Sequence, residues 1–138
     1  MAAPLSSKTF KFELVAPERI LASEDVAMVT VPGSAGEFGV LADHAPVVSS
    51  MRPGVIEVQD PSGEIKRIFV SGGFADVTGE LCTVLAEEAV NVNDIDRSAV
   101  EKKLEELRGQ LAEAADDVAK AALARDIAIA EAKLAAVA

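Results

Sequence analysis

Residues 55–85, VIEVQDPSGEIKRIFVSGGFADVTGELCTVL, decide the fold of this chain. Short runs rich in apolar residues are separated here by Pro61-Ser62-Gly63, Gly72-Gly73 and Thr78-Gly79. Such runs are typical of β-strands, and the Gly- and Pro-containing segments between them are typical of tight turns. The first and the last of the three segments are predicted to be hairpin tips.

The same pattern continues toward the N-terminus. Residues 10–14 alternate apolar and charged side chains, as on a half-buried strand, and Pro17 ends this strand. The other predicted strands are residues 26–31, 47–51, 55–59, 65–70, 74–77 and 81–85. Regular short strands with Gly and Pro between them indicate a sandwich or barrel, so we predict an all-β sandwich over residues 1–90.

The composition changes near Val92, where Ala, Glu, Lys and Leu become frequent and Pro is absent. We predict that residues 91–138 form an antiparallel hairpin of two helices. Asn93 or Asp94 is expected to cap the first helix, and residues 114–117 are expected to turn into the second. Apolar residues at helical spacing form two stripes: Val100, Leu104, Leu107 and Leu111, then Leu123, Ile127, Ala130, Leu134 and Val137.

This hairpin is expected to be marginal by itself. Its stripes hold few large side chains, and ordering each residue costs on the order of 1.5 kcal/mol. We therefore expect it to dock on the β domain or on a partner.

Charge limits the partners of the chain. The formal net charge is -10, and both predicted domains are acidic. Such a protein repels nucleic acid and anionic membrane surfaces and favours a partner that is basic where it touches. No stretch has the run of apolar residues that a membrane-spanning helix requires, so direct membrane insertion is not expected.

Cysteine use and the N-terminal sequence bear on location. The single cysteine, Cys82, fits a reducing compartment and is interpreted as a small buried hydrophobic residue. No leader-like segment begins the sequence, so a cytoplasmic or membrane-peripheral protein is expected.

Catalytic, metal-binding and cofactor-binding patterns are not found. Residues 33–39 have glycines three apart, but no helix is predicted behind them to bind phosphate, so a loop of tight turns is expected. His44, the only histidine, is interpreted as a structural or contact residue. Residues 94–105 place acids as in a calcium-binding EF-hand loop, but Ala99 replaces the required glycine. No catalytic residue, metal or cofactor is predicted.

Three stretches closely resemble the epsilon subunit of F-type ATP synthases. They are VPGSAGEFGVLADHAP at residues 31–46, MRPGV at 51–55, and VSGGFADV at 70–77 leading into TVLAE at 83–87. The family pattern is similar to G-E-[LF]-G-[IV]-L-P-x-H-A-P, and Ala42 stands where a proline is usual. The resemblance covers nearly the whole predicted β domain.

The resemblance implies a ten-stranded β-sandwich at the foot of the central stalk. Such a subunit binds gamma on one side and the polar, basic loops of the c-ring on another. It is a rotor part that couples proton flow to ATP synthesis and catalyses nothing itself. By the same resemblance, the c-ring contact is expected at Glu37, Phe38 and His44, with Gly36, Gly39 and Pro46 shaping the loop.

In the C-terminal region the resemblance is weaker. Ile95 and Asp96 match the start of a nucleotide-binding motif of the family, but Arg97 is displaced from the position of its arginine, so ATP binding is not expected. Contact of the helices with the catalytic alpha and beta subunits is implied, whereas inhibition of hydrolysis is not expected because the second helix is acidic. The implied location is the cytoplasmic face of a bacterial inner membrane, as a peripheral subunit.

Two other hypotheses stay open from the sequence. A small acidic ligand-binding or scaffold module would use the helices as a dimerisation arm and would become monomeric without the residues after Val92. An enzyme would depend on His44 and lose its activity in His44→Ala.

Overall fold

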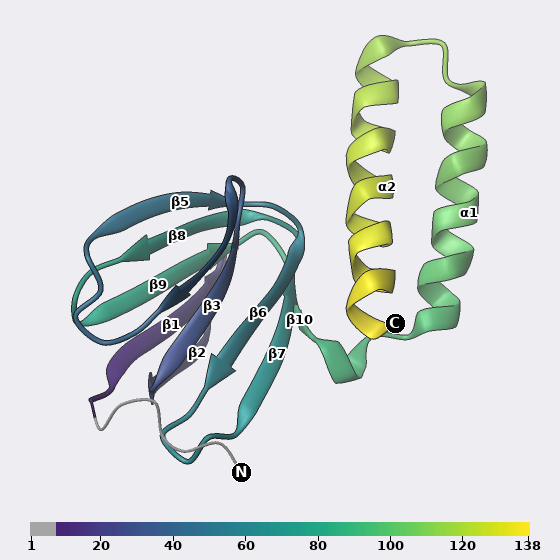
Figure 1. The fold of residues 1–138 in the computed structure, drawn as a ribbon. Coiled ribbons are helices and arrows are strands. Elements are labelled where there is room, and N and C mark those ends of the chain that lie inside the picture. The colour runs from purple at the N-terminus through teal and green to yellow at the C-terminus, as the bar shows by residue number, and fades with distance from the viewer. Residues whose placement is uncertain (1–7) are drawn as a thin grey trace. The chain divides into compact units, whose positions relative to one another are not determined.

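The computed structural model describes residues 8–138, which form an all-β unit ending at Asn91 and a helical unit from Val92 to Ala138 (Figure 1). Residues 1–7, which the predicted first domain includes, lie outside the described part. The β unit contains ten strands: β1 (Phe10–Ala16), β2 (Arg19–Val26), β3 (Met28–Gly33), β4 (Gly36–Val40), β5 (Val47–Met51), β6 (Gly54–Gln59), β7 (Ile65–Val70), β8 (Gly73–Val77), β9 (Leu81–Ala86) and β10 (Ala89–Asn91). The predicted all-β sandwich of about ten strands followed by two helices is confirmed.

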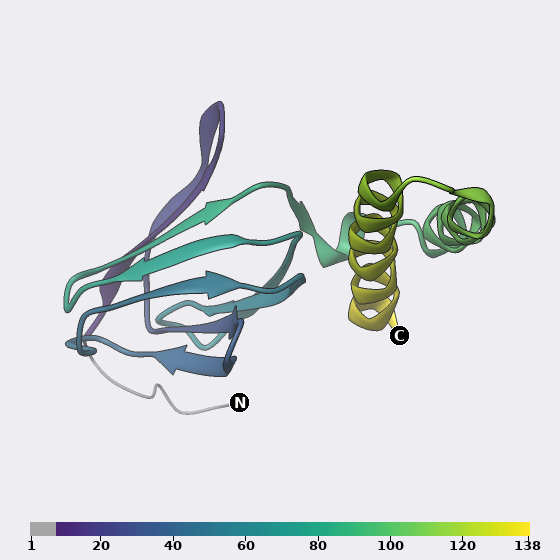
Figure 2. The same ribbon diagram turned by 90° about the horizontal axis from the view of Figure 1, so that it is seen from above.

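The strands pair in the order β10-β7-β6-β3-β5-β8-β9-β1-β2, with β4 on β3. All pairs are antiparallel except β1 with β9. Seen from above, the strands curve around a common interior (Figure 2). Both predicted hairpin tips are confirmed, because residues 60–64 connect β6 to β7 and residues 78–80 connect β8 to β9.

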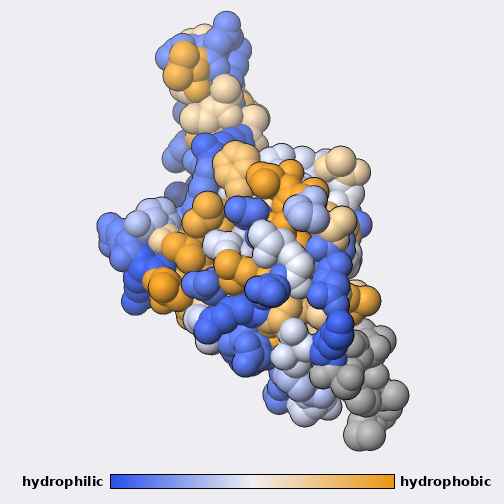
Figure 3. Space-filling model, turned by 90° about the vertical axis from the view of Figure 1, so that its left-hand side faces the viewer, coloured by the Kyte–Doolittle hydropathy of each residue, from blue (hydrophilic) through white to orange (hydrophobic). Residues whose placement is uncertain are grey.

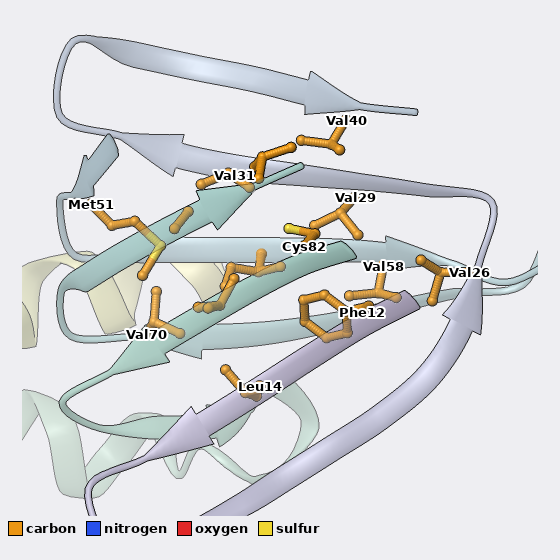
Figure 4. Close-up of a cluster of buried hydrophobic side chains, with 14 of the residues drawn as sticks. Phe12, Leu14, Val26, Val29, Val31, Val40, Met51, Val58, Val70 and Cys82 are labelled. Atoms are coloured by element: carbon orange, nitrogen blue, oxygen red, sulfur yellow. The ribbon is translucent and has the colours of Figure 1, made fainter. Parts of the chain in front are cut away.

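The interior is aliphatic, as the near absence of aromatic residues requires. On β1 the alternating Phe10, Phe12 and Leu14 are all buried, which confirms the predicted face of this strand. Figure 4 shows Phe12 and Leu14 reaching the same cluster as Val58 of β6 and Cys82 of β9. This shared core joins strands from both layers of the sandwich.

The predicted strands depart from the structure in four places. The predicted strand at 26–31 is two strands meeting at Ala27, and β2 and β10 were not predicted. β2 was missed because its sequence is largely polar. A polar sequence suits this strand, since it pairs only with β1 and little of it is buried. Residues 36–40, predicted as part of a loop of tight turns, form β4, where pairing with β3 and burial of Val40 outweigh two glycines.

The helical unit consists of a short 3-10 helix η1 (Val92–Asp94), α1 (Arg97–Glu113) and α2 (Asp117–Val137). The predicted cap at Asn93 or Asp94 was wrong, because η1 occupies these residues and Asp96 caps α1. Asp116 caps α2, in the segment predicted for the turn. The predicted stripes meet at Leu104, Leu107 and Ala130, with Val100, Leu123, Ile127 and Leu134 packed against them.

Candidate interaction site

The β3–β4 hairpin carries the predicted contact residues. Its strands pair Val31 with Phe38, Pro32 with Glu37 and Gly33 with Gly36. The turn between them is anchored to β5, because the backbone N–H of Ser34 donates to the Ser50 carbonyl oxygen at 2.9 Å and the two hydroxyls lie 2.8 Å apart. The hairpin tip is therefore fixed by bonds to a neighbouring strand.

The two glycines of β4 differ in what constrains them. Gly36 has a φ of 142°, a backbone conformation that residues other than glycine rarely adopt. A Cβ at Gly39 would lie 2.8 Å from the terminal methyl of Met28. The φ of Gly36 favours glycine at the hairpin tip, whereas the Met28 methyl is the end of a flexible side chain that can move away from a Cβ at position 39. The loop-shaping roles of Gly36 and Gly39 stay predictions, and Gly36 and Gly39 belong to a strand.

Glu37 and Phe38 point to opposite sides of β4. Glu37 is exposed, whereas Phe38 is half-buried and packs against the core. β4 pairs only with β3, so the other edge of this strand is open to a partner. Among the expected c-ring contacts, Glu37 is thus accessible on β4, whereas Phe38 is turned toward the core of the chain. The contact roles of both residues stay predictions.

His44 is not brought next to Glu37. It follows the far end of β4, where the neighbouring Asp43 N–H donates to the Gly79 carbonyl oxygen at 2.9 Å. The half-buried imidazole has its Nδ1 2.7 Å from the Ala45 carbonyl oxygen, and Pro46 is exposed just before β5. The expected contact residues therefore lie at the two ends of β4.

The predicted nucleotide positions have structural roles at the start of α1. The N–H of Ile95 donates to the Val92 carbonyl oxygen at 3.2 Å. The Asp96 carboxylate accepts from the N–H of Ala99 at 3.3 Å and so caps the helix. The Arg97 Nε lies 3.0 Å from the Glu101 carboxylate. Both charged groups therefore have structural partners at the start of α1.

Within residues 8–138 there is no group of three or more His, Cys, Asp or Glu side chains placed so that they could bind a metal ion. Cys82 is fully buried. Burial, and to a lesser degree the charge of Asp76, raise the pKa of its thiol to about 12. A thiol in that state is not a nucleophile at neutral pH.

Sequence analysis missed a row of apolar side chains on the outer face of the sheet. The register places Ile20 opposite Val15, Val15 opposite Leu85, and Leu85 opposite Phe74. Ile20, Phe74 and Leu85 are about half exposed or more, at 61%, 55% and 49%. Side chains that are directly opposite in a sheet share a face, so these four form one outward row. The alternation of residues 74–77 could have shown that Phe74 points away from the buried Ala75 and Val77, whereas the row itself depends on the register between strands.

A hollow of about 320 Å³ adjoins this row, and residues 15–17, 73–74 and 85–87 line it. Figure 3 shows that hydrophobic residues are exposed between hydrophilic ones on one side of the molecule. Exposed apolar surface beside a hollow is typical of a protein-binding surface.

The sequence of the β unit matches a known protein family. Residues 9–92 match the model of the β-sandwich domain of the ATP synthase delta/epsilon chain. The chain belongs to this family.

Relatives and solved structures agree with this assignment. The ATP synthase epsilon chain of Rhodospirillum rubrum is 48% identical over 130 residues, covering 94% of this chain and 97% of the relative. The epsilon chain of Mesorhizobium japonicum is 47% identical over 114 residues, which cover 83% of this chain and 84% of the relative. A chain of the Euglena gracilis mitochondrial ATP synthase superposes with a TM-score of 0.85 at 30% identity, covering 94% of this chain and 82% of that one.

A chain of the Tetrahymena thermophila mitochondrial ATP synthase, solved as central stalk and c-ring, has a TM-score of 0.66 at 13% identity and shows the shared fold. The resemblance to epsilon subunits is confirmed. The protein is a non-catalytic subunit of ATP synthase. Within residues 8–138, neither helix is both long and apolar enough to cross a membrane.

Proposed function

We propose that this chain is the central-stalk rotor subunit that links gamma to the c-ring and couples proton flow to ATP synthesis. The family membership carries the proposal, since the matched segment includes both the β3–β4 hairpin and the apolar row. Solved relatives come from complexes described as F1 with c-ring and as central stalk with c-ring, which supports these partners. Coupling requires two docking surfaces and no catalytic group.

Glu37 is the proposed contact to the c-ring. It is an exposed carboxylate on an open strand edge, and the hairpin that carries it is held by bonds to β5. A basic loop would meet it as a rim ion pair, which steers association more than it strengthens the bound state. The conformation of β4 is thus fixed before docking, so little ordering entropy is lost on binding.

We further propose that the subunit acts at the cytoplasmic face of a bacterial inner membrane, held there by its partners. Two bacterial relatives, from Rhodospirillum rubrum and Mesorhizobium japonicum, support the bacterial setting. The net charge of -10 opposes direct adsorption to an anionic membrane.

Charge reversal at Glu37 tests the c-ring contact. Membranes that carry the complete synthase with Glu37→Lys should show proton pumping reduced by several-fold at unchanged gamma content, because like charges would then meet at the c-ring. Glu64→Lys, with the same charge change at the exposed tip of the β6–β7 hairpin, is the matched control. Equal proton pumping by both variants and the wild type would contradict the proposed contact between Glu37 and the c-ring.

A further inference from the structure

Asp43 has an unusual backbone conformation in the loop between β4 and β5. Its φ is 65°, and within residues 8–138 it is the only residue other than glycine with a positive φ. A Cβ disfavours this left-handed region, although aspartate and asparagine tolerate it better than most residues. Such a conformation persists only where the surrounding structure imposes it, and it is concentrated at functional sites. The conformation of Asp43 therefore points to a role for this loop.

The positive φ is what a type II turn requires. The N–H of His44 donates to the Leu41 carbonyl oxygen at 3.2 Å, so residues 41–44 form a four-residue turn with Asp43 at its third position. A type II turn has a positive φ at the third position only, as Asp43 has here. The turn ends on His44, whose imidazole Nδ1 lies 2.7 Å from the Ala45 carbonyl oxygen. The conformation of Asp43 thus sets the direction in which the backbone presents His44.

Two further contacts hold Asp43 in place. Its N–H donates to the Gly79 carbonyl oxygen at 2.9 Å, which ties the loop to the turn between β8 and β9. A Cβ at Gly79 would lie 3.7 Å from the Cα of Asp43, so the two backbones approach closely. The Asp43 carboxylate accepts from the Lys8 Nζ at 2.7 Å, but both side chains are mostly exposed. Because an exposed ion pair contributes little, the backbone of Asp43 is expected to hold the loop more than its charge does.

We propose that Asp43 is a positioning residue for His44. Its left-handed backbone fixes the turn of residues 41–44 against the β8–β9 turn and so keeps His44 in one orientation before docking. The inference rests on the proposed function and on the expected contact of His44 with the c-ring. A loop that is already ordered loses little conformational freedom on binding, whereas a mobile loop loses more and binds more weakly. Asp43 therefore acts on the contact through the loop that carries His44.

Three substitutions at position 43 separate the effect of conformation from that of charge. Asp43→Val removes the carboxylate and strongly disfavours a positive φ, because valine is β-branched. Asp43→Gly and Asp43→Asn also remove the charge, but glycine and asparagine adopt this conformation more readily. The protection of the His44 amide against hydrogen exchange should therefore fall about ten-fold in Asp43→Val. In the glycine and asparagine variants it should fall by no more than about three-fold.

Proton pumping by membranes that carry the complete synthase is the functional measurement. Asp43→Val should reduce pumping several-fold, toward the level of His44→Ala, and Asp43→Gly should restore it because the turn forms again. Glu64→Val is the matched control, since Glu64 is an exposed acid next to the β6–β7 turn and its φ is not positive. This control should match the wild type both in pumping and in the protection of the His44 amide.

The outcomes distinguish this inference from the proposed function. If Glu37→Lys and His44→Ala both pump like the wild type, the proposed contact with the c-ring is itself wrong. If Glu37→Lys is impaired but His44→Ala or Asp43→Val is not, the contact stands and only the positioning by Asp43 is wrong. Equal losses in Asp43→Val and Asp43→Gly would show that the carboxylate and Lys8 hold the loop in place of the backbone, which would also overturn the inference.

Discussion

At the scale of single residues, Gly73 is the position that tolerates change least. Its φ is 136°, and a Cβ there would collide with the carbonyl oxygen of Leu85 on the neighbouring strand. Gly73→Ala should therefore lower the free energy of unfolding by about 3 kcal/mol, measured by urea denaturation. Gly79→Ala is the control, because its Cβ would make only an ordinary contact, 3.7 Å from Asp43. Equal losses for the two variants would contradict this account.

Cys82 gives the protein a pH dependence in the alkaline range. Burial raises the pKa of the Cys82 thiol to about 12 in the folded state, whereas the thiol of the unfolded chain titrates near its ordinary value of 9.0. Between these values the unfolded chain loses a proton that the folded chain keeps, so stability falls as pH rises, by up to about 1.4 kcal/mol per pH unit.

Cys82→Ala removes this contribution and adds a constant cavity cost. The stability difference between wild type and variant, from denaturation at several pH values, should therefore shrink from pH 9 upward. A difference that stays constant to pH 11 would refute the assignment. Reaction with a thiol reagent at pH 8 should require unfolding.

At the scale of elements, the start of α1 depends on Asp96. Its carboxylate accepts from the N–H of Ala99, whereas Asp94 belongs to η1. Asp96→Ala should destabilise the helical unit by about 1 kcal/mol, and Asp94→Ala by much less. The midpoint of helix loss, followed by circular dichroism at 222 nm, measures both. A larger loss of stability for Asp94→Ala than for Asp96→Ala would contradict this assignment and support Asp94 as the cap, as predicted from the sequence.

Elements that bury one face could be predicted from the sequence, and elements held mainly by their neighbours could not. The bounds of β5 and β7 agree with prediction, because apolar runs between Gly and Pro mark them. β4 was missed because two glycines obscure a strand that exists through its pairing with β3. The cap of α1 was misplaced because a 3-10 turn cannot be told from a helix start by composition.

The candidate site was predictable only in part, for the same reason. The family motif singled out Glu37, which is exposed on β4, and its contact role stays a prediction. The apolar row was not predicted, since it depends on the register among β2, β1, β9 and β8. Register between distant strands cannot be read from local alternation. The separation of His44 from Glu37 likewise follows from β4 being an extended strand.

At the scale of the whole molecule, the two units differ in the size of their buried hydrophobic clusters. The β unit has a large continuous cluster of buried residues from most of its strands, whereas the buried cluster between α1 and α2 is Leu104, Leu107 and Ala130. Helices of this length are marginal in water without tertiary packing. Residues 1–91 should therefore fold cooperatively by themselves, and residues 92–138 alone should be largely unfolded.

Circular dichroism and amide hydrogen exchange on the two fragments measure this difference. In the full chain, amides of α1 and α2 should exchange faster than those of β1 and β9, because the helical unit opens at a lower free energy than the sandwich. The fragment of residues 1–91 should retain binding to a gamma-containing complex, since it contains all ten strands of the β unit. A cooperatively melting 92–138 fragment, or equal protection in the two units, would show that the hairpin carries its own stability.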